Sequence, residues 1–329
     1  MPFRVIIIGA GSRGRHWINL TRSNEQFQPV AIVDPSDGVH SFIAKEHPDL
    51  ARFKTIEDAK GKIEVDVAVI SAISLYRREN CLDALSAGWH ILAEKPFALS
   101  INDAKEIVNT GKRLGLVVSV GQNYRFDSGV GTMQKQIADG MIGKVGHGVF
   151  VRHRKRYAGN TYQKDMRHNY LWEMGVHDLD LVRFTVGLKP LLVTGFSFLP
   201  PWGDFTGETT VSAIYEFENG VKVNYFGAWA SHIPEFHWRI DGSQGSIRLG
   251  NGLEFGKPED SAWKGVEHIG SFGGDNRLLV ELADAISNKG KTSTNGEDNL
   301  WTVAMMDAVV QSTKMGGEPV SISDMVGFG

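Results

Sequence analysis

The sequence has a single cysteine, Cys81, and no long hydrophobic run. One cysteine excludes an internal disulfide framework and suits a reducing compartment. No stretch approaches the roughly 20 apolar residues of a membrane span, and the apolar residues 5–8 are too few for a secretory signal. We therefore expect a cytoplasmic protein with no membrane partner.

An excess of basic charge is also missing. Lysine and arginine total 35 against 38 acidic residues, so the formal net charge is -3 and nucleic acid is not an expected partner. Of the 329 residues, 42% are hydrophobic and 22% are charged, which is typical of a globular protein. The length favours two domains over one.

The first third of the chain alternates between strand-like and helix-like segments. Apolar runs predict strands at 4–8, 29–33, 65–70, 90–94 and 117–120. Helices are expected between them, the last at 101–114 with Ser100 as its N-cap. This alternation predicts a doubly wound parallel sheet of the α/β Rossmann type.

A glycine-rich loop follows the first predicted strand at once. It has the spacing Gly-x-Gly-x-x-Gly and leads into a helix. The first glycine permits a tight turn, the second lets the backbone approach a pyrophosphate, and the third lets helix pack on strand. The start of the helix also favours an anion. We expect a dinucleotide to contact Gly9, Gly11, Ser12, Arg13 and Gly14.

Asp34 ends the second strand, 20 residues after Gly14. A carboxylate at this position accepts hydrogen bonds from both hydroxyls of the adenosine ribose, and it repels a 2′-phosphate. No lysine or arginine occurs at 35–38 to offset it, so NAD is favoured over NADP. Arg13 could pair with such a phosphate, but we interpret it as a neighbour of the pyrophosphate. The alternative for Asp34 is a turn acid.

Polar side chains also follow three later strands. The carboxyl ends of parallel strands form the edge where ligands bind. Lys95 lies there, within Glu94-Lys95-Pro96, and the proline fixes the backbone φ angle after it. Taken alone, Lys95 could equally be a surface lysine in a turn. The further cofactor contacts expected at this edge are Ser71, Ala72, Ile73, Glu94, Lys95, Gln122 and Asn123.

Three features together resemble the Gfo/Idh/MocA family of NAD(P)-dependent oxidoreductases: the glycine loop with Asp34, Glu94-Lys95-Pro96, and the run from Gln122 to Phe126. The resemblance covers essentially the whole chain. It implies a Rossmann domain at 1–123 and an α+β domain at 124–329 with an open, largely antiparallel sheet. We expect C-terminal helices within 276–314 to pack back on the first domain.

The same resemblance implies a carbohydrate substrate, such as a sugar or polyol, and a homodimer or homotetramer formed through the C-terminal sheet. It implies that Lys95 contacts the nicotinamide ribose and the reacting hydroxyl. The chain departs from the family at residues 71–76, where Thr-Pro-Asn and a following histidine are usual.

In the second half, Glu173, His177 and Asp180 are spaced i, i+4, i+7 within a predicted helix at 170–182. They would share one helix face. A histidine with a carboxylate one turn to either side can be oriented for proton transfer near neutral pH. The resemblance implies that His177 is the acid-base residue and that Glu173 replaces a frequent aspartate.

Two alternatives remain for this helix. His177 could be a solvated surface histidine, or the three residues with His168 could be metal ligands. We expect no metal, because the helix lacks a second histidine at ligand spacing and hydride transfer needs none.

The polar loop before this helix is basic and contains Tyr157. It could hold a hydroxyl-rich or carboxylate-bearing ligand, or it could be a solvated charge run. Trp172 could stack on a sugar or pack in the core. The expected substrate contacts are Lys95, Tyr124, Arg125, Arg152, Tyr157, Trp172, Glu173 and His177, with His153, Arg154, Arg156 and Asn160 as further loop candidates.

We therefore predict hydride transfer from a sugar or polyol carbon to NAD. His177 would take the hydroxyl proton, and Lys95 would stabilise charge on the oxygen. Glu173 and Asp180 would orient His177. The alternatives are an NAD-dependent enzyme that cleaves glycosides or epimerises without net redox change, and a cofactor-sensing regulator without catalysis.

Overall fold

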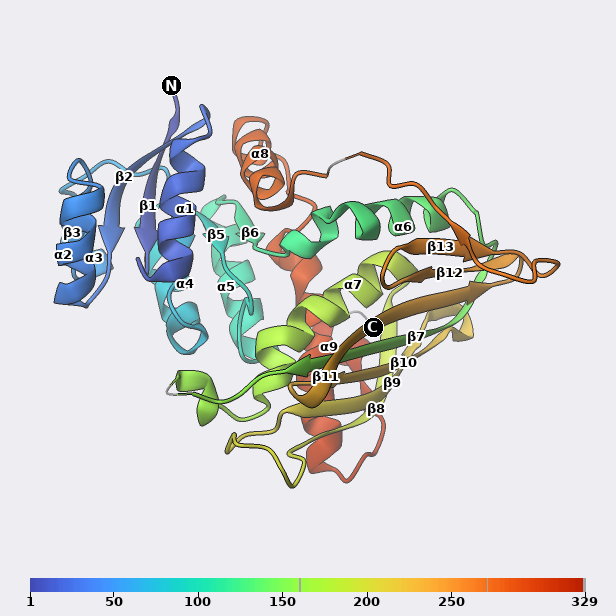
Figure 1. Ribbon diagram of the computed structural model, residues 1–329. Helices are drawn as coiled ribbons and strands as arrows, with labels where there is room; N and C mark the ends of the chain where they lie inside the picture. Colours follow the sequence, from blue (N-terminus) through green and yellow to red (C-terminus); the bar gives the residue numbers. More distant parts are fainter. Residues whose placement is uncertain (160, 271, 328–329) are drawn as a thin grey trace. The chain divides into compact units, whose positions relative to one another are not determined.

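The computed structural model describes residues 1–159, 161–270 and 272–327. The chain forms two compact units. The first comprises residues 1–123 and 274–300, and the second comprises residues 124–273 and 301–329. In the ribbon of Figure 1 the first unit begins in blue, and strands β7 (Val145–Lys155) to β13 (Leu253–Gly256) of the second unit run from green to orange.

The first unit is built on a parallel sheet, six-stranded within the described residues, in the order β3-β2-β1-β4-β5-β6. The strand order reverses between β1 and β4, which is where a doubly wound sheet binds its ligand. The strands are β1 (Phe3–Ile8), β2 (Phe27–Val33), β3 (Ala51–Phe53), β4 (Val67–Ile70), β5 (His90–Ala93) and β6 (Val118–Val120).

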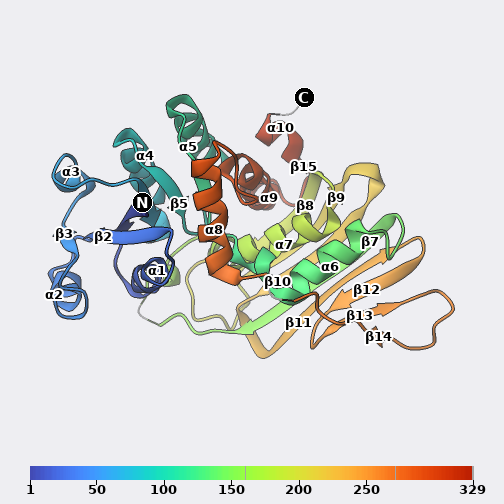
Figure 2. The same ribbon diagram turned by 90° about the horizontal axis from the view of Figure 1, so that it is seen from above.

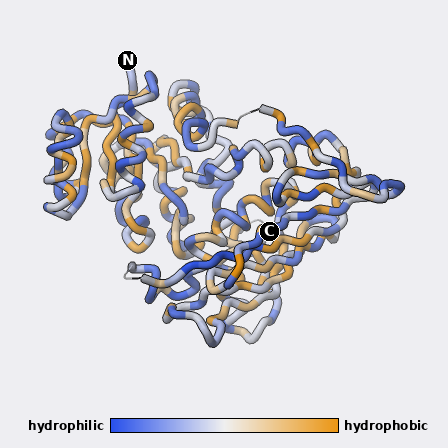
Figure 3. The backbone as a smooth tube through the Cα atoms, in the orientation of Figure 1, coloured by the Kyte–Doolittle hydropathy of each residue, from blue (hydrophilic) through white to orange (hydrophobic). Residues whose placement is uncertain are grey.

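Helices lie on both faces of this sheet, with α1 on one face and α4 and α5 on the other (Figure 2). The central strands are hydrophobic along their length, as Figure 3 shows, because both faces are covered. The helices of this unit are α1 (Ser12–Arg22), α2 (Asp37–Glu46), α3 (Ile56–Ala59), α4 (Arg77–Ser86), α5 (Ile101–Leu114) and α8 (Gly274–Ser287).

The second unit has a mixed sheet, nine-stranded where the chain is described, in the order β14-β13-β12-β11-β7-β10-β9-β8-β15. Neighbouring strands are antiparallel apart from the parallel pair β7 and β10, so the largely antiparallel sheet is confirmed. The strands are β7 (Val145–Lys155), β8 (Pro190–Phe198), β9 (Thr210–Phe217), β10 (Lys222–Ala228), β11 (Ala230–Gly242), β12 (Gly245–Leu249), β13 (Leu253–Gly256), β14 (Lys264–Gly265) and β15 (Val320–Ser321).

Helices α6 (Ser128–Ala138) and α7 (Val176–Val186) cover one face of this sheet, side by side in Figures 1 and 2. Phe150, Tyr225 and Trp238 pack beneath them, and the ring of Phe150 lies 5.5 Å and 5.6 Å from the other two. The unit also holds α10 (Ile322–Val326) and most of α9 (Gly296–Lys314).

Two expectations differ from this architecture. The helix predicted at 170–182 is divided: residues Leu171–Gly175 form a π-helical turn, and α7 begins only at Val176. The C-terminal helices were expected on the first domain, but only α8 and the start of α9 belong to that unit. In the described part of the chain, no helix combines the length and the apolar composition needed to cross a membrane.

Candidate functional site

The glycine loop of the first unit joins β1 to α1 at the carboxyl edge of the sheet. Gly9 has a φ angle of +87°, and a Cβ atom there would lie 2.5 Å from the Cα of Ala72. A Cβ atom on Gly14 would lie 2.0 Å from the carbonyl oxygen of Gly9. Both glycines are therefore required by the turn and by the packing of α1 on the strand.

Gly11 has different surroundings. It is the N-cap residue of α1, its φ angle is -66°, and a Cβ atom there would meet nothing within 4 Å. No side chain caps the helix at this point, so its first N–H groups have no intrahelical or capping acceptor. Open space beside uncapped N–H groups fits the pyrophosphate of a dinucleotide.

Asp34 lies directly after β2, and its side chain holds the glycine loop. One carboxylate oxygen accepts a hydrogen bond from the N–H of Ala10 at 2.9 Å, and the other accepts from Ser36 N–H at 2.9 Å. Each oxygen can accept a second hydrogen bond, so the carboxylate can still bind ribose hydroxyls. The residues present therefore fit the adenosine half of NAD.

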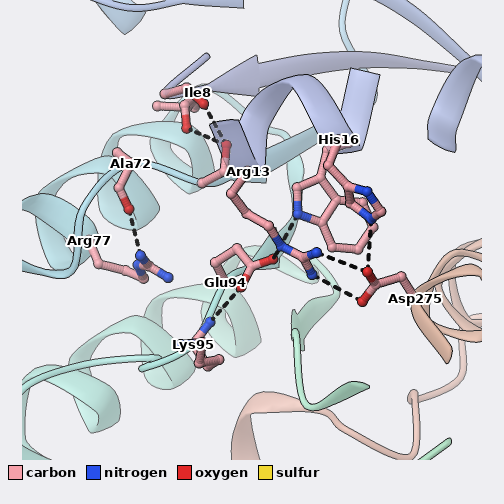
Figure 4. A network of polar contacts seen from close by, with 11 residues as sticks. Ile8, Arg13, His16, Ala72, Arg77, Glu94, Lys95 and Asp275 are labelled. Atoms are coloured by element: carbon pink, nitrogen blue, oxygen red, sulfur yellow. Dashed lines mark hydrogen bonds and ion pairs between the residues drawn. The ribbon is translucent and has the colours of Figure 1, made fainter. Parts of the chain in front are cut away.

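Arg13 and Glu94 belong to a network that joins α1, the end of β5 and α8, shown in Figure 4. Arg13 donates two parallel hydrogen bonds to Asp275, at 2.9 and 3.0 Å, and its Nε donates to Glu94. Trp17 donates to the same oxygen of Glu94 at 2.8 Å, and the Arg13 guanidinium lies 4.9 Å from the Trp17 ring.

This network gives two expected cofactor residues, Arg13 and Glu94, partners within the protein. Burial opposes ionisation of Asp275, but Arg13 and His16 hold its pKa below the usual value. Arg13 is thus bound to two carboxylates, which compete with a phosphate for its N–H groups. The sequence gives no signal for Asp275, because it lies 262 residues from Arg13.

The other strand ends meet at the same edge. Ser71 N–H donates to Ile8, Glu94 N–H to Ile70, and Gly121 N–H to Ala93, at 2.8 to 2.9 Å. The expected residues at these ends differ in exposure: Ile73 is exposed, Lys95 and Asn123 are half-buried, and Gln122 is buried. The peptide bond between Lys95 and Pro96 is cis.

Ser71 and Ala72 form hydrogen bonds with other residues of the protein. The Ser71 hydroxyl donates to the Gly9 carbonyl at 2.6 Å, and the Ala72 carbonyl accepts from Arg77. The buried amide of Gln122 has no hydrogen-bond partner for either polar atom among the described residues. An unpaired buried amide is costly, and a bound dinucleotide would be a source of the missing partner.

In the second unit, His177 is the second residue of α7 and is 6% exposed. Tyr124 stacks on its ring, with centroids 4.0 Å apart and planes 12° apart. Glu173 lies in the π-helical turn, where its carboxylate accepts from the Tyr162 hydroxyl at 2.8 Å. A π turn shifts the residue register and often occurs at functional sites. The regular α-helix expected across Glu173 and His177 is therefore interrupted.

Asp180 has a different partner from the one expected. Arg125 donates to both of its oxygens at 2.6 Å, and the Thr302 hydroxyl donates to one of them at 2.8 Å. Arg125 is 4% exposed. The structure thus places Asp180 and Arg125 in a buried ion pair, and the roles of Asp180 toward His177 and of Arg125 toward a substrate stay predictions.

A second buried acid, Asp178, was missed by the sequence analysis. Arg152 donates to it through Nε at 2.6 Å, and the hydroxyls of Tyr170 and Tyr225 donate to its other oxygen at 2.6 and 3.0 Å. Burial raises the pKa of Asp178 above its usual value although all three donors oppose the shift. The one sequence signal for this cluster is an acidic residue among the apolar residues of a helix.

The remaining substrate candidates are dispersed. Tyr157 is 70% exposed, whereas Trp172 is buried and packs in the core. His153 contacts the Ser231 hydroxyl at 2.9 Å, and Arg156 lies over the Trp229 ring. Arg154 is exposed, and Asn160 lies outside the described residues.

Two adjoining hollows in the second unit bring other candidates together. Their volumes are about 550 and 350 Å³. Both are lined by Arg152, Phe236, Gly250 and Asn251, and the smaller one is also lined by Tyr124. In the first unit a hollow of about 560 Å³ lies at the amino ends of β5 and β6, away from the glycine loop. No cluster of three histidine, cysteine, aspartate or glutamate side chains that could hold a metal ion occurs in residues 1–159, 161–270 and 272–327.

Comparisons with known proteins agree with this architecture. A family model described as "Oxidoreductase family, NAD-binding Rossmann fold" matches residues 3–122, and one described as "GFO/IDH/MocA C-terminal domain" matches residues 130–248. The chain is 25% identical to a 1,5-anhydro-D-fructose reductase of Ensifer adhaerens over 326 residues, covering 94% of this chain and 96% of that protein.

Two further similarities concern a dehydrogenase and a solved structure. A D-apiose dehydrogenase of Rhizobium rhizogenes is 26% identical over 254 residues, which is 71% of this chain and 73% of that protein. An oxidoreductase from Agrobacterium radiobacter, in complex with NAD+, L-tartaric acid and magnesium, matches with a TM-score of 0.88. That match has 23% identity and covers 99% of this chain and 100% of that one, so it shows a common fold.

Proposed function

This chain belongs to the Gfo/Idh/MocA family of NAD-binding oxidoreductases, and we propose that it transfers a hydride between a hydroxyl-bearing carbon of a sugar or polyol and the nicotinamide of NAD. The carbohydrate class is supported by the relatives named as an anhydrofructose reductase and an apiose dehydrogenase. When bound, NAD would supply the hydride acceptor.

The observation that carries the proposal is the loop between β1 and α1. Gly11 leaves open space beside uncapped helix N–H groups, and Asp34 anchors the loop with acceptor capacity to spare. These features hold a pyrophosphate and a ribose without a 2′-phosphate. They support NAD over NADP.

In the proposed reaction His177 takes the proton of the substrate hydroxyl. Its ring is held in one plane by Tyr124, so its nitrogens point in fixed directions. Lys95 stabilises negative charge as it develops on the reacting oxygen. Glu173 is a positioning residue on the turn before α7, where Tyr162 fixes its carboxylate.

The test compares His177→Ala and Lys95→Ala with two controls, His147→Ala and Lys112→Ala, whose side chains are 64% and 77% exposed. We expect kcat to fall about 10²- to 10⁴-fold for each site variant, the range that general acid-base catalysis contributes. NAD affinity of His177→Ala should stay at the wild-type value. Turnover at the wild-type rate in either folded site variant would overturn the assigned roles.

The same assay separates the alternatives. A screen of aldoses, inositols, sugar acids and polyols with NAD should give a net rise in NADH absorbance for at least one compound. An enzyme that reduces and reoxidises NAD within one turnover would convert substrate with no net NADH. A regulator would bind NAD and convert nothing.

We also propose that the protein works in the cytoplasm as a homo-oligomer assembled through the sheet of the second unit. The lone cysteine supports the reducing compartment. Large apolar side chains on β8 and β9 support the assembly, because Phe196, Phe198 and Ile214 are each more than 40% exposed.

A further inference from the structure

Arg152 is anchored in a way that leaves part of its guanidinium unused. The side chain is nine-tenths buried, and Nε donates to Asp178, which is fully buried. Tyr170 and Tyr225 donate to the other oxygen of the same carboxylate. Three donors on one buried acid fix the direction of the arginine, because a group so held has little freedom to turn.

The two remaining nitrogens of Arg152, Nη1 and Nη2, have no hydrogen-bond partner within the described residues. The guanidinium lies over the ring of Phe236, with its carbon 4.2 Å from the ring centroid. One face is therefore stacked and one edge is bonded, while the fork of Nη1 and Nη2 is unpaired. A planar fork of this kind matches the two oxygens of a carboxylate.

The hollows beside Arg152 can hold a ligand at this fork. Arg152 lines both of them, with volumes of about 550 and 350 Å³. Tyr124 lines the smaller one, and its ring stacks on His177. A ligand in the smaller hollow would therefore contact Tyr124, the residue that stacks on the proposed proton acceptor.

The charges that line the hollows balance, so they carry no excess of positive charge that would attract a dianion. Arg152, Arg154 and Arg248 face three carboxylates, Asp127, Glu235 and Glu254. Two of the carboxylates already have partners: Glu254 accepts from Arg248 at 2.7 Å, and Asp127 accepts from the first N–H groups of α6. This balance would repel a phosphate dianion more than a single carboxylate.

Burial alone would lower the pKa of Arg152, but Asp178 and the nearby tyrosines raise it above its usual value. The side chain therefore stays charged at any pH at which the protein is folded. A vicinal diol of a neutral sugar could accept the same two hydrogen bonds, but charge-assisted bonds to a carboxylate are stronger.

We propose that Arg152 binds a carboxylate of the substrate and that the preferred carbohydrate is a sugar acid. This proposal rests on the proposed function and names the substrate class of that same site. It also assigns Asp178, Tyr170 and Tyr225 as positioning residues that act through Arg152.

The first experiment uses wild-type protein and matched substrate pairs that differ in one group: glucuronate and glucose, galacturonate and galactose, gluconate and sorbitol. We expect the acid to have the higher kcat/KM in at least one pair, by about 10- to 100-fold, as charge-assisted bonds to a carboxylate imply. Equal or better turnover of the neutral member of every active pair would overturn the proposal while leaving the proposed function intact. Absence of NADH from every compound would count against the proposed function itself.

The second experiment changes the arginine. Arg152→Gln should raise KM for the acid about 10- to 100-fold with little change for the neutral sugar. Arg239→Gln is the matched control, because Arg239 also pairs with an aspartate but lies outside both hollows. Arg152→Lys should be intermediate, because it keeps the charge and loses the fork.

Removing Arg152 leaves Asp178 as a buried unpaired charge, so Arg152→Gln could fail to fold. The double variant Arg152→Gln with Asp178→Asn removes both charges and should show the same selective loss for the acid. Equal losses for acid and neutral substrates in a folded variant would contradict the role of Arg152.

Discussion

Gly11 and Gly14 stand three residues apart in one glycine motif, yet an added methyl group would meet opposite surroundings. At Gly14 it would lie 2.0 Å from a backbone oxygen, and at Gly11 it would meet nothing within 4 Å. The packing of the protein therefore requires one glycine, and the proposed pyrophosphate requires the other. Gly14 therefore has a structural role, whereas Gly11 has the proposed binding role.

We predict that Gly11→Ala folds with the stability of the wild type but binds NAD at least about 10-fold more weakly, because its methyl group would occupy the space of the pyrophosphate. Gly14→Ala should lower the free energy of unfolding by roughly 1–3 kcal/mol or more, because the backbone must shift. Denaturant unfolding without ligand and NAD titration measure the two effects separately. Undiminished NAD affinity in Gly11→Ala would contradict the assigned binding site.

The partners of the arginines were the hardest feature of the site to predict from the sequence. Arg13, Arg125 and Arg152 were all expected at ligands, and each is bound to one or more carboxylates of the protein. Burial and pairing depend on residues far along the chain, so a basic residue near a motif does not reveal its partner. Arg152 differs from the other two in its unpaired Nη fork.

Among the elements, regular helices and strands were the most predictable. The helix expected at 101–114 is α5 (Ile101–Leu114), and Ser100 caps it by accepting from Asp103 N–H at 3.1 Å. Its local sequence contains the cap, the apolar stripe and Gly115 at its end. The short β3 and α3 were missed, because three or four residues carry too little pattern.

The π-helical turn at Leu171–Gly175 could not be read from the sequence. Its residues match an α-helical pattern, and the extra residue in the turn reflects packing at both ends. Tyr170 before it and Asp178 after it bond to each other inside the core. Tertiary contacts of this kind override local helix preference.

The ion pair between Arg125 and Asp180 links the 3₁₀ turn at Asn123–Phe126 to α7. The hydroxyl of Thr302, on α9, donates a hydrogen bond to the same carboxylate. We predict that Arg125→Met destabilises the protein by up to about 3–5 kcal/mol, because the buried Asp180 loses its 2.6 Å ion pair and keeps only Arg183, at 3.4 Å, as a charged partner. Adding Asp180→Leu to this variant should recover much of the loss. Thermal and denaturant unfolding of the single and double variants measure the coupling.

Similar stability of Arg125→Met and the wild type would show that Asp180 is compensated by other groups. It would also reopen a substrate role for Arg125, which the buried pair now disfavours.

At the scale of the whole molecule, the most notable surface feature is a group of exposed apolar side chains on the sheet of the second unit. Phe196, Phe198 and Ile214 lie on one face of β8 and β9, since Thr194 pairs with Ile214 and Phe196 with Ser212. An exposed apolar sheet face of this kind commonly marks a subunit interface.

We predict a dimer or tetramer in solution, and dissociation to smaller species on Ile214→Asp, because a carboxylate would be buried unpaired in the interface. Light scattering after size-exclusion chromatography measures both masses, and Glu216→Asp, on a half-buried position of the same strand, is the control. A wild-type monomer, or an unchanged mass for Ile214→Asp, would contradict the proposed assembly.

The central claim is that this chain moves a hydride from a carbohydrate carbon to NAD. The most direct test incubates the protein with NAD and a substrate from the screen that carries deuterium on the hydroxyl-bearing carbon. We predict that one deuterium appears on C4 of the nicotinamide for each NADH formed. NADH without deuterium, or release of the deuterium to water, would contradict the claim.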